Sequence, residues 1–113
     1  MYSFETSYSC DCGCLAVWCG GSIILFNNGY GDGCHKFYVG SRADFESFTE
    51  AKGIKPKFLT ACIFKDALVL NYDCPVVYED GSVADPYKTS VVLNGRYGIY
   101  CHEGSVFFEK WKD

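Results

Sequence analysis

Apolar and polar residues follow one another in short runs along this chain, and most runs have the length of a β-strand. Residues 15–19 and 23–26 are apolar, and the Gly20-Gly21 pair between them is a dipeptide that two-residue hairpin turns favour. After a glycine-rich loop over residues 27–33, residues 35–39 are expected to return as a strand. These segments predict a β-meander.

The period of the pattern changes after residue 40. Ser41 and Asp44 have the spacing of a capping box, with Asp in place of Glu, and Gly53 follows as a stop signal. A helix over residues 42–52 would place its phenylalanines on one face. We therefore expect this helix to lie against the sheet.

The second half of the chain has strand patterns again. Two apolar runs, residues 58–64 and 67–72, are separated by a Lys-Asp pair. Asn94-Gly95 stands between β-forming residues, which predicts a type I′ hairpin at this dipeptide. A turn at Glu103-Gly104 is expected to lead into a last strand over residues 105–111.

These elements predict one α+β domain over residues 1–113, with a largely antiparallel β-sheet made of a meander and hairpins and one short helix packed on it. A chain of 113 residues has the usual size of one domain. Within it, an irregular stretch over residues 1–13 is left open, because Asp11 and Gly13 interrupt the pattern there.

The composition of the chain bears on whether it binds nucleic acid or a membrane, and on its compartment. Aromatic residues make up 18% of the chain, which favours strands. The net charge is −4 and the ten Lys and Arg residues are scattered, so we expect no binding to a nucleic acid duplex. The longest apolar stretch, residues 15–26, is too short to span a membrane. With no cation before Lys36 to form a targeting signal, the sequence predicts a cytoplasmic protein, in the host cytoplasm if it is viral.

The cysteines are the first candidates for chemistry. Zinc is an open alternative, although Cys-x-Cys-x-Cys departs from the usual Cys-x2-4-Cys spacing, and the other cysteines are expected to pack as reduced thiols. A Cys-His pair also occurs twice, but neighbouring side chains in a strand point to opposite faces, so neither pair predicts a catalytic dyad. The candidate metal ligands are Cys10, Cys12, Cys14, Cys34 and His35.

The glycine-rich loop is the second candidate. Successive amides of such a loop can bind an anion, and Tyr30 could stack on a base, so Gly29, Tyr30, Gly31 and Gly33 are candidate contacts for a nucleotide-like ligand. A plain hairpin loop with the same residues needs no ligand. Asp32 in the loop also repels a phosphate.

The leading hypothesis is a small acidic, non-catalytic binding protein that regulates or inhibits a protein partner by occluding it, as viral and phage accessory proteins do. Its high aromatic content predicts exposed anchors, with Tyr87 and Trp111 as partner contacts beside the loop. A homo-oligomer through open sheet edges is left open. The aromatic residues expected at the surface are Tyr2, Phe4, Tyr8, Tyr30, Tyr87 and Trp111.

Overall fold

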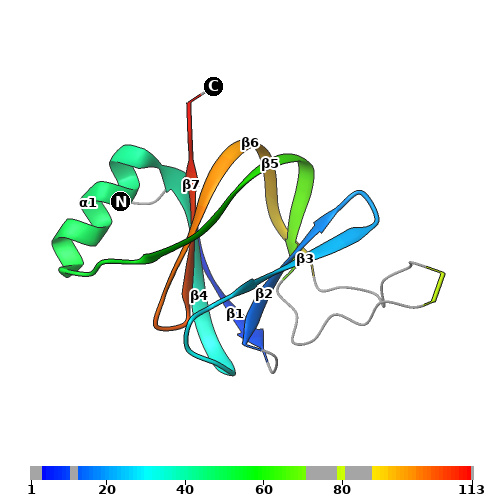
Figure 1. Cartoon of the computed structure of the whole chain (residues 1–113), viewed down its shortest axis with the longest axis horizontal. Coiled ribbons are helices and arrows are strands. Elements are labelled where there is room, and N and C mark those ends of the chain that lie inside the picture. The colour runs from blue at the N-terminus through cyan, green and yellow to red at the C-terminus, as the bar shows by residue number, and fades with distance from the viewer. Residues whose placement is uncertain (1–3, 11–12, 71–78, 81–87, 113) are drawn as a thin grey trace.

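Seven strands join in one curled sheet with the order β1-β4-β7-β6-β5-β2-β3, and one helix lies on its outer side (Figure 1). This computed structural model describes residues 4–10, 13–70, 79–80 and 88–112. The elements in chain order are β1 (Phe4–Cys10), β2 (Cys14–Cys19), β3 (Ser22–Asn27), β4 (Gly33–Ser41), α1 (Arg42–Lys52), β5 (Lys57–Leu70), β6 (Lys88–His102) and β7 (Ser105–Lys110).

The expected α+β fold with an antiparallel meander is wrong in its main feature. The fold is mostly β, and its sheet is mixed, because β4 runs parallel to β7 with Tyr38 beside Phe107. The β2–β3 hairpin forms at Gly20-Gly21 as predicted, but β4 pairs with β1 and β7 and not with β3. Local periodicity indicates that a segment is a strand, whereas its partner depends on packing between distant segments.

The predicted hairpin at Asn94-Gly95 is also wrong, since β6 runs through this dipeptide without turning. The Lys-Asp pair of β5 lies opposite it, and β5 is likewise continuous there. The register shifts between Phe64 and Ala67, so that two residues of β5 face Asn94 alone. This is a β-bulge, and a bulge of this kind bends the strand pair and increases its local twist.

Hydrogen bonding explains why turn-forming residues occur in the middle of two strands. The Asn94 Oδ1 accepts a hydrogen bond of 2.7 Å from the Asp66 backbone N–H. Asp66 and Gly95 both have positive φ, 49° and 110°. Each dipeptide therefore provides one residue in the positive-φ conformation that the bulge contains, and neither dipeptide reverses the chain.

Helix α1 is confirmed where it was predicted. Its N-cap Ser41 accepts from the Asp44 N–H at 3.2 Å, and the Asp44 carboxylate accepts from the Ser41 N–H at 3.2 Å. Gly53 ends the helix in the left-handed conformation. The helix packs its phenylalanines, Phe45 and Phe48, on an outer-face cluster of the sheet.

Two apolar clusters lie on opposite faces of the sheet. The larger one fills the inside of the curl and includes Phe26, Phe37, Phe64 and Phe108. The smaller one, under α1, includes Tyr38 and Phe107 in a stacked pair 4.9 Å apart. Among the described residues, no helix is long and apolar enough to cross a membrane.

Candidate functional site

The glycine-rich loop and Trp111, both singled out in the sequence, lie at opposite ends of the parallel β4–β7 pair. At the start of these strands, the glycine-rich loop is organised around Asn28, whose side chain is completely buried. The Asn28 Oδ1 accepts from the N–H groups of Tyr30 and Gly31, both at 2.9 Å. The Gly29 N–H is bonded to the Asn27 side chain. The amides that would form an anion nest are thus bonded within the loop.

His35 packs beside this loop. Its Nε2 lies 3.0 Å from the Gly31 carbonyl oxygen, and its ring contacts those of Tyr8 and Tyr30. Tyr30 is 71% exposed, as expected for a contact residue. The expectation that Tyr8 is exposed is wrong, because Tyr8 is buried and its hydroxyl donates a 2.7 Å hydrogen bond to the Gly104 carbonyl.

The candidate metal ligands are spread over different environments. Cys10 is buried beside Asn28, Cys14 is half-buried and Cys34 is exposed. In the part of the chain that the structure describes, no group of three or more His, Cys, Asp or Glu side chains could hold a metal ion. Cys12 lies outside the described residues, so the zinc site stays a prediction.

Burial disfavours the ionised forms of several side chains, and this predicts a stability that depends on pH. Burial is the main cause that raises the pKa of Tyr8, Tyr100 and Cys101 above their ordinary values. The unfolded chain loses these protons first, so the free energy of unfolding should fall as the pH rises above about 9. Tyr8 should contribute up to about 1.4 kcal/mol per pH unit above its unfolded pKa. Urea denaturation from neutral to alkaline pH measures this loss.

The control for this prediction is Tyr8→Phe. The variant loses the hydrogen bond to Gly104 at every pH but has one titrating hydroxyl fewer. Its unfolding free energy should therefore be lower at neutral pH and should decline less steeply in alkali. An equal slope in both proteins would show that Tyr8 is not a source of the pH dependence.

At the other end of the β4–β7 pair lies Trp111, directly after β7. Its backbone N–H donates a 2.8 Å hydrogen bond to the Arg96 carbonyl, so the chain here continues the pairing with β6. The indole lies against Gly98 of β6, where a Cβ atom would come within 2.7 Å of the ring. A glycine at this position therefore provides the space that the indole occupies.

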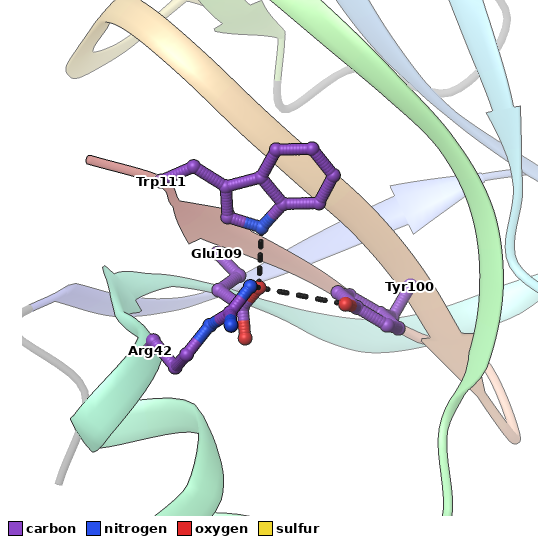
Figure 2. A network of polar contacts seen from close by, with 4 residues as sticks. All are labelled: Arg42, Tyr100, Glu109 and Trp111. Carbon is purple, nitrogen blue, oxygen red and sulfur yellow. Dashed lines mark hydrogen bonds and ion pairs between the residues drawn. The ribbon is translucent and has the colours of Figure 1, made fainter. Parts of the chain in front are cut away.

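A buried carboxylate holds the indole in place (Figure 2). Glu109 is only 2% exposed, and its Oε1 accepts a 2.5 Å hydrogen bond from the Trp111 Nε1. Tyr100 donates to the same oxygen at 3.4 Å, and an Arg42 nitrogen lies 3.6 Å from it. Since a buried carboxylate is costly without donors, these three partners explain how Glu109 is tolerated beneath the surface.

Two cavities flank Trp111, and together they are called the Trp111 cleft. Both are lined by Ser41, Lys110, Trp111 and Lys112, so they adjoin at these four residues. One, of about 600 Å³, extends along the end of β4, and the other, of about 720 Å³, extends to the first turn of α1 and to Arg96. The cleft thus lies where β4, α1, β6 and β7 meet.

The charge of the cleft differs from that of the whole chain. Its lining includes four cations and only two carboxylates, Asp44 and Glu46, in a protein of net charge −4. Asp44 already accepts a hydrogen bond as the helix cap, and Arg42 is paired with Glu109. The cleft is therefore suited to a negatively charged group. The four cations are Arg42, Arg96, Lys110 and Lys112.

Exposed apolar side chains continue this surface along β5. Ile63 is paired with Arg96 and is 78% exposed. Phe58, on the same strand, is 50% exposed and contacts the Tyr100 ring. An aromatic, a cationic and an aliphatic side chain thus lie in neighbouring positions at Trp111, Arg96 and Ile63.

Sequence reasoning singled out Trp111 as an exposed partner contact but missed the groups around it. Its side chain is half-buried, and its role as a contact stays a prediction. Two lysines next to Trp111 in the sequence were a signal of local positive charge. Nothing local marked Glu109 as buried, because two of its three partners, Arg42 and Tyr100, come from α1 and β6. Of the other predicted contacts, Gly33 lies opposite Cys10 at the start of β4. The expectation that Phe4 is exposed is wrong, because its ring is half-buried against Phe37. Tyr2 and Tyr87 lie outside the described residues.

The structure thus keeps the predicted contacts apart, with the glycine-rich loop at the start of β4 and Trp111 beyond the end of β7. Among the described residues, the second of these places combines hollowed surface, concentrated positive charge and exposed apolar side chains. Comparisons with protein-family models, curated proteins and solved structures find no match to this chain.

Proposed function

We propose that this protein is a non-catalytic binding domain that recognises a segment of a protein partner through the Trp111 cleft and the neighbouring Ile63. The observation that carries the proposal is that Trp111, Arg96 and Ile63 lie side by side. Trp111 is bonded to Arg96 of β6, and Arg96 is paired with Ile63 of β5. Tryptophan and arginine are the residues that most often dominate binding energy at protein interfaces. A bound segment would bury Ile63, which water now surrounds.

The chemistry of the cleft favours a segment with both carboxylate and apolar side chains. Four cations face the cleft, and a carboxylate can pair with arginine in two parallel hydrogen bonds. The apolar area of Ile63 and Phe58 gives a peptide side chain a place to pack, which a small inorganic anion would not use. The net charge of −4 opposes the approach of a polyanion such as a nucleic acid.

The rigid support of Trp111 fits binding better than catalysis. Glu109, the buried carboxylate of the site, is engaged by three donors and holds the indole. An anchor that is fixed before binding loses little conformational entropy when the partner arrives. We extend the proposal to a regulator or inhibitor in the cytoplasm that works by occluding its partner, in the manner of viral accessory proteins.

Nothing in the described residues favours the nucleotide alternative over this one. Such a ligand would need free amides in the glycine-rich loop, and those of Gly29, Tyr30 and Gly31 are bonded to Asn27 and Asn28. The loop still offers the exposed ring of Tyr30. We therefore place the proposed contact at the Trp111 cleft.

Affinity capture with matched variants tests the proposal. Partners held by the wild-type protein should be lost, with binding at least about ten-fold weaker, in Arg96→Glu and in Ile63→Asp. Val92→Asp is the control, because Val92 is exposed on the same strand as Arg96 but outside the cleft. Quantitative mass spectrometry of the captured proteins, followed by titration of the purified partner, measures the difference.

Gly98→Ala separates the position of the indole from its presence. The added methyl group would displace the ring of Trp111 without removing it, and we expect it to weaken capture as strongly as Trp111→Ala does. Partners that bind equally to the wild-type protein and to all the cleft variants would refute the assignment of the cleft.

A further inference from the structure

The sheet has two free edges, and one of them is β3. It pairs with β2 on one side through six consecutive residue pairs, from Ser22 with Cys19 to Asn27 with Cys14. No other strand lies beyond it in the sheet of the described residues. The unbroken register means that no bulge twists this edge away from an incoming strand.

The side chains of β3 give this edge no protection. Exposed edge strands in natural proteins usually carry charges, proline or bulges that prevent pairing with another chain. The sequence of β3 is SIILFN, and no residue from 13 to 31 is charged. Ile24 and Leu25 are 37% and 51% exposed.

The opposite edge, β1, is different. Its Glu5 carboxylate forms a 2.8 Å ion pair with Lys36 of β4, and both side chains are about half exposed. Glu5 therefore places a charge on the β1 edge, and a charge on an edge strand disfavours pairing with another chain. The contrast indicates that β3 is the edge with an occupant.

The turn before β3 determines which backbone groups face outward. In a hairpin with a two-residue turn, the residues that flank the turn, here Cys19 and Ser22, exchange both of their hydrogen bonds. Along an antiparallel pair these positions alternate, so Ser22, Ile24 and Phe26 bond to β2. The N–H and C=O groups of Ile23 and Leu25 therefore point away from the sheet.

We propose that a second copy of this chain occupies the edge, with the two β3 strands antiparallel about a two-fold axis at Ile24. Outward-facing residues must then pair with outward-facing residues, which places Ile23 opposite Leu25 of the second copy. The two Ile24 side chains meet on the axis. A register of the same parity with its axis at Leu25 leaves as many pairs, but it places Ile23 opposite the polar Asn27 of the second copy.

At Ile23, Ile24 and Leu25 this arrangement brings apolar side chains of the two copies together, while Ser22 lies opposite Phe26. The exposed Leu25 is covered by an isoleucine on the same face of the joined sheet, and Ile24 is covered by its own symmetry mate. No charge meets another charge, although each copy carries a net charge of −4. Two-fold dimers that use the same patch on both subunits are the commonest form of protein assembly. The Trp111 cleft, on β4, β6 and β7, stays outside this contact.

Sedimentation velocity over a range of protein concentrations tests the dimer. We expect the wild-type protein to be dimeric at micromolar concentration and Leu25→Lys to dissociate at least about a hundred-fold more readily, because two lysines would then lie opposite apolar side chains in the joined sheet. Val92→Lys adds the same charge at a residue of similar exposure on the central strand β6 and should stay dimeric. A monomeric wild-type protein at every concentration would overturn the proposal.

Amide hydrogen exchange of the wild-type protein gives a second test that does not depend on whether a variant folds. The amides of Ile23 and Leu25 should become protected as the concentration rises, whereas those of the β1 edge should not change. Rapid exchange of Ile23 and Leu25 at concentrations where the protein is dimeric would place the contact elsewhere and refute this assignment.

Discussion

Replacing Gly104 with alanine is expected to lower the free energy of unfolding by about 3 kcal/mol or more. Gly104 is the second residue of the β6–β7 turn, with a φ of 92°, and an added Cβ would lie 2.2 Å from the Nδ1 atom of His35. Its N–H and C=O are bonded to Asn28 and Tyr8. The backbone therefore has little freedom to move away from the imidazole.

The chain contains a matched control for this substitution. Gly21 is also the second residue of a two-residue turn, its φ is 91°, and no atom lies within 4 Å of an added Cβ. Gly21→Ala should show only the cost of the left-handed conformation, about 1 to 2 kcal/mol. Urea denaturation of both variants gives the difference, which measures the clash with His35.

A double variant distinguishes a steric cause from a general weakness of the turn. In the His35→Ala background the imidazole is absent, so Gly104→Ala should cost about as much as Gly21→Ala. Equal costs of Gly104→Ala with and without His35 would contradict the steric explanation.

Asn28→Ala is expected to lower the free energy of unfolding by about 3 kcal/mol, because the substitution removes a buried amide and leaves the partly buried N–H groups of Tyr30 and Gly31 without their acceptor. The carboxamide accepts hydrogen bonds from Tyr30 and Gly31 and donates one of 2.8 Å to the Gly31 carbonyl. The side chain is fully buried, so water cannot replace these bonds without opening the loop. Chemical denaturation measures the loss.

Asn27 provides the control for this prediction. It precedes Asn28, is exposed, and makes one side-chain hydrogen bond, to the Gly29 N–H. Asn27→Ala should cost less than about 1 kcal/mol, since water can take over this bond. Asn28→Asp would keep the acceptor but bury a charge, and we expect it to be at least as damaging as Asn28→Ala. Similar small losses for Asn27→Ala and Asn28→Ala would show that the loop is not organised by Asn28.

Local signals in the sequence predicted the elements whose ends are fixed by neighbouring residues. The capping box at Ser41 and Asp44 and the stop at Gly53 gave the correct bounds of α1. Gly20-Gly21 gave the β2–β3 hairpin, and Glu103-Gly104 gave the turn before β7. In each case the required φ values or hydrogen bonds involve residues close together in the chain.

The same kind of signal failed at Asn94-Gly95, for a reason that only the tertiary structure contains. A dipeptide that tolerates positive φ fits a hairpin turn and a bulge equally well. The bulge forms because β5 brings its own Lys65-Asp66 pair opposite Asn94, with the Asp66 N–H bonded to the asparagine side chain. Both dipeptides are visible in the sequence, but their position opposite each other cannot be predicted from it.

The candidate site also has some features that the sequence predicts and others that only the structure shows. The sequence by itself determined that a last strand leads to Trp111, that two lysines flank this residue, that the chain is acidic, and that α1 begins at Arg42. Only the tertiary structure decided that Glu109 is buried beneath the indole and that Arg96 and Ile63 lie beside it. Helix caps and tight turns depend on contacts within a few residues, whereas the parallel pairing of β4 with β7 and the burial of a carboxylate depend on the packing of segments distant in the chain.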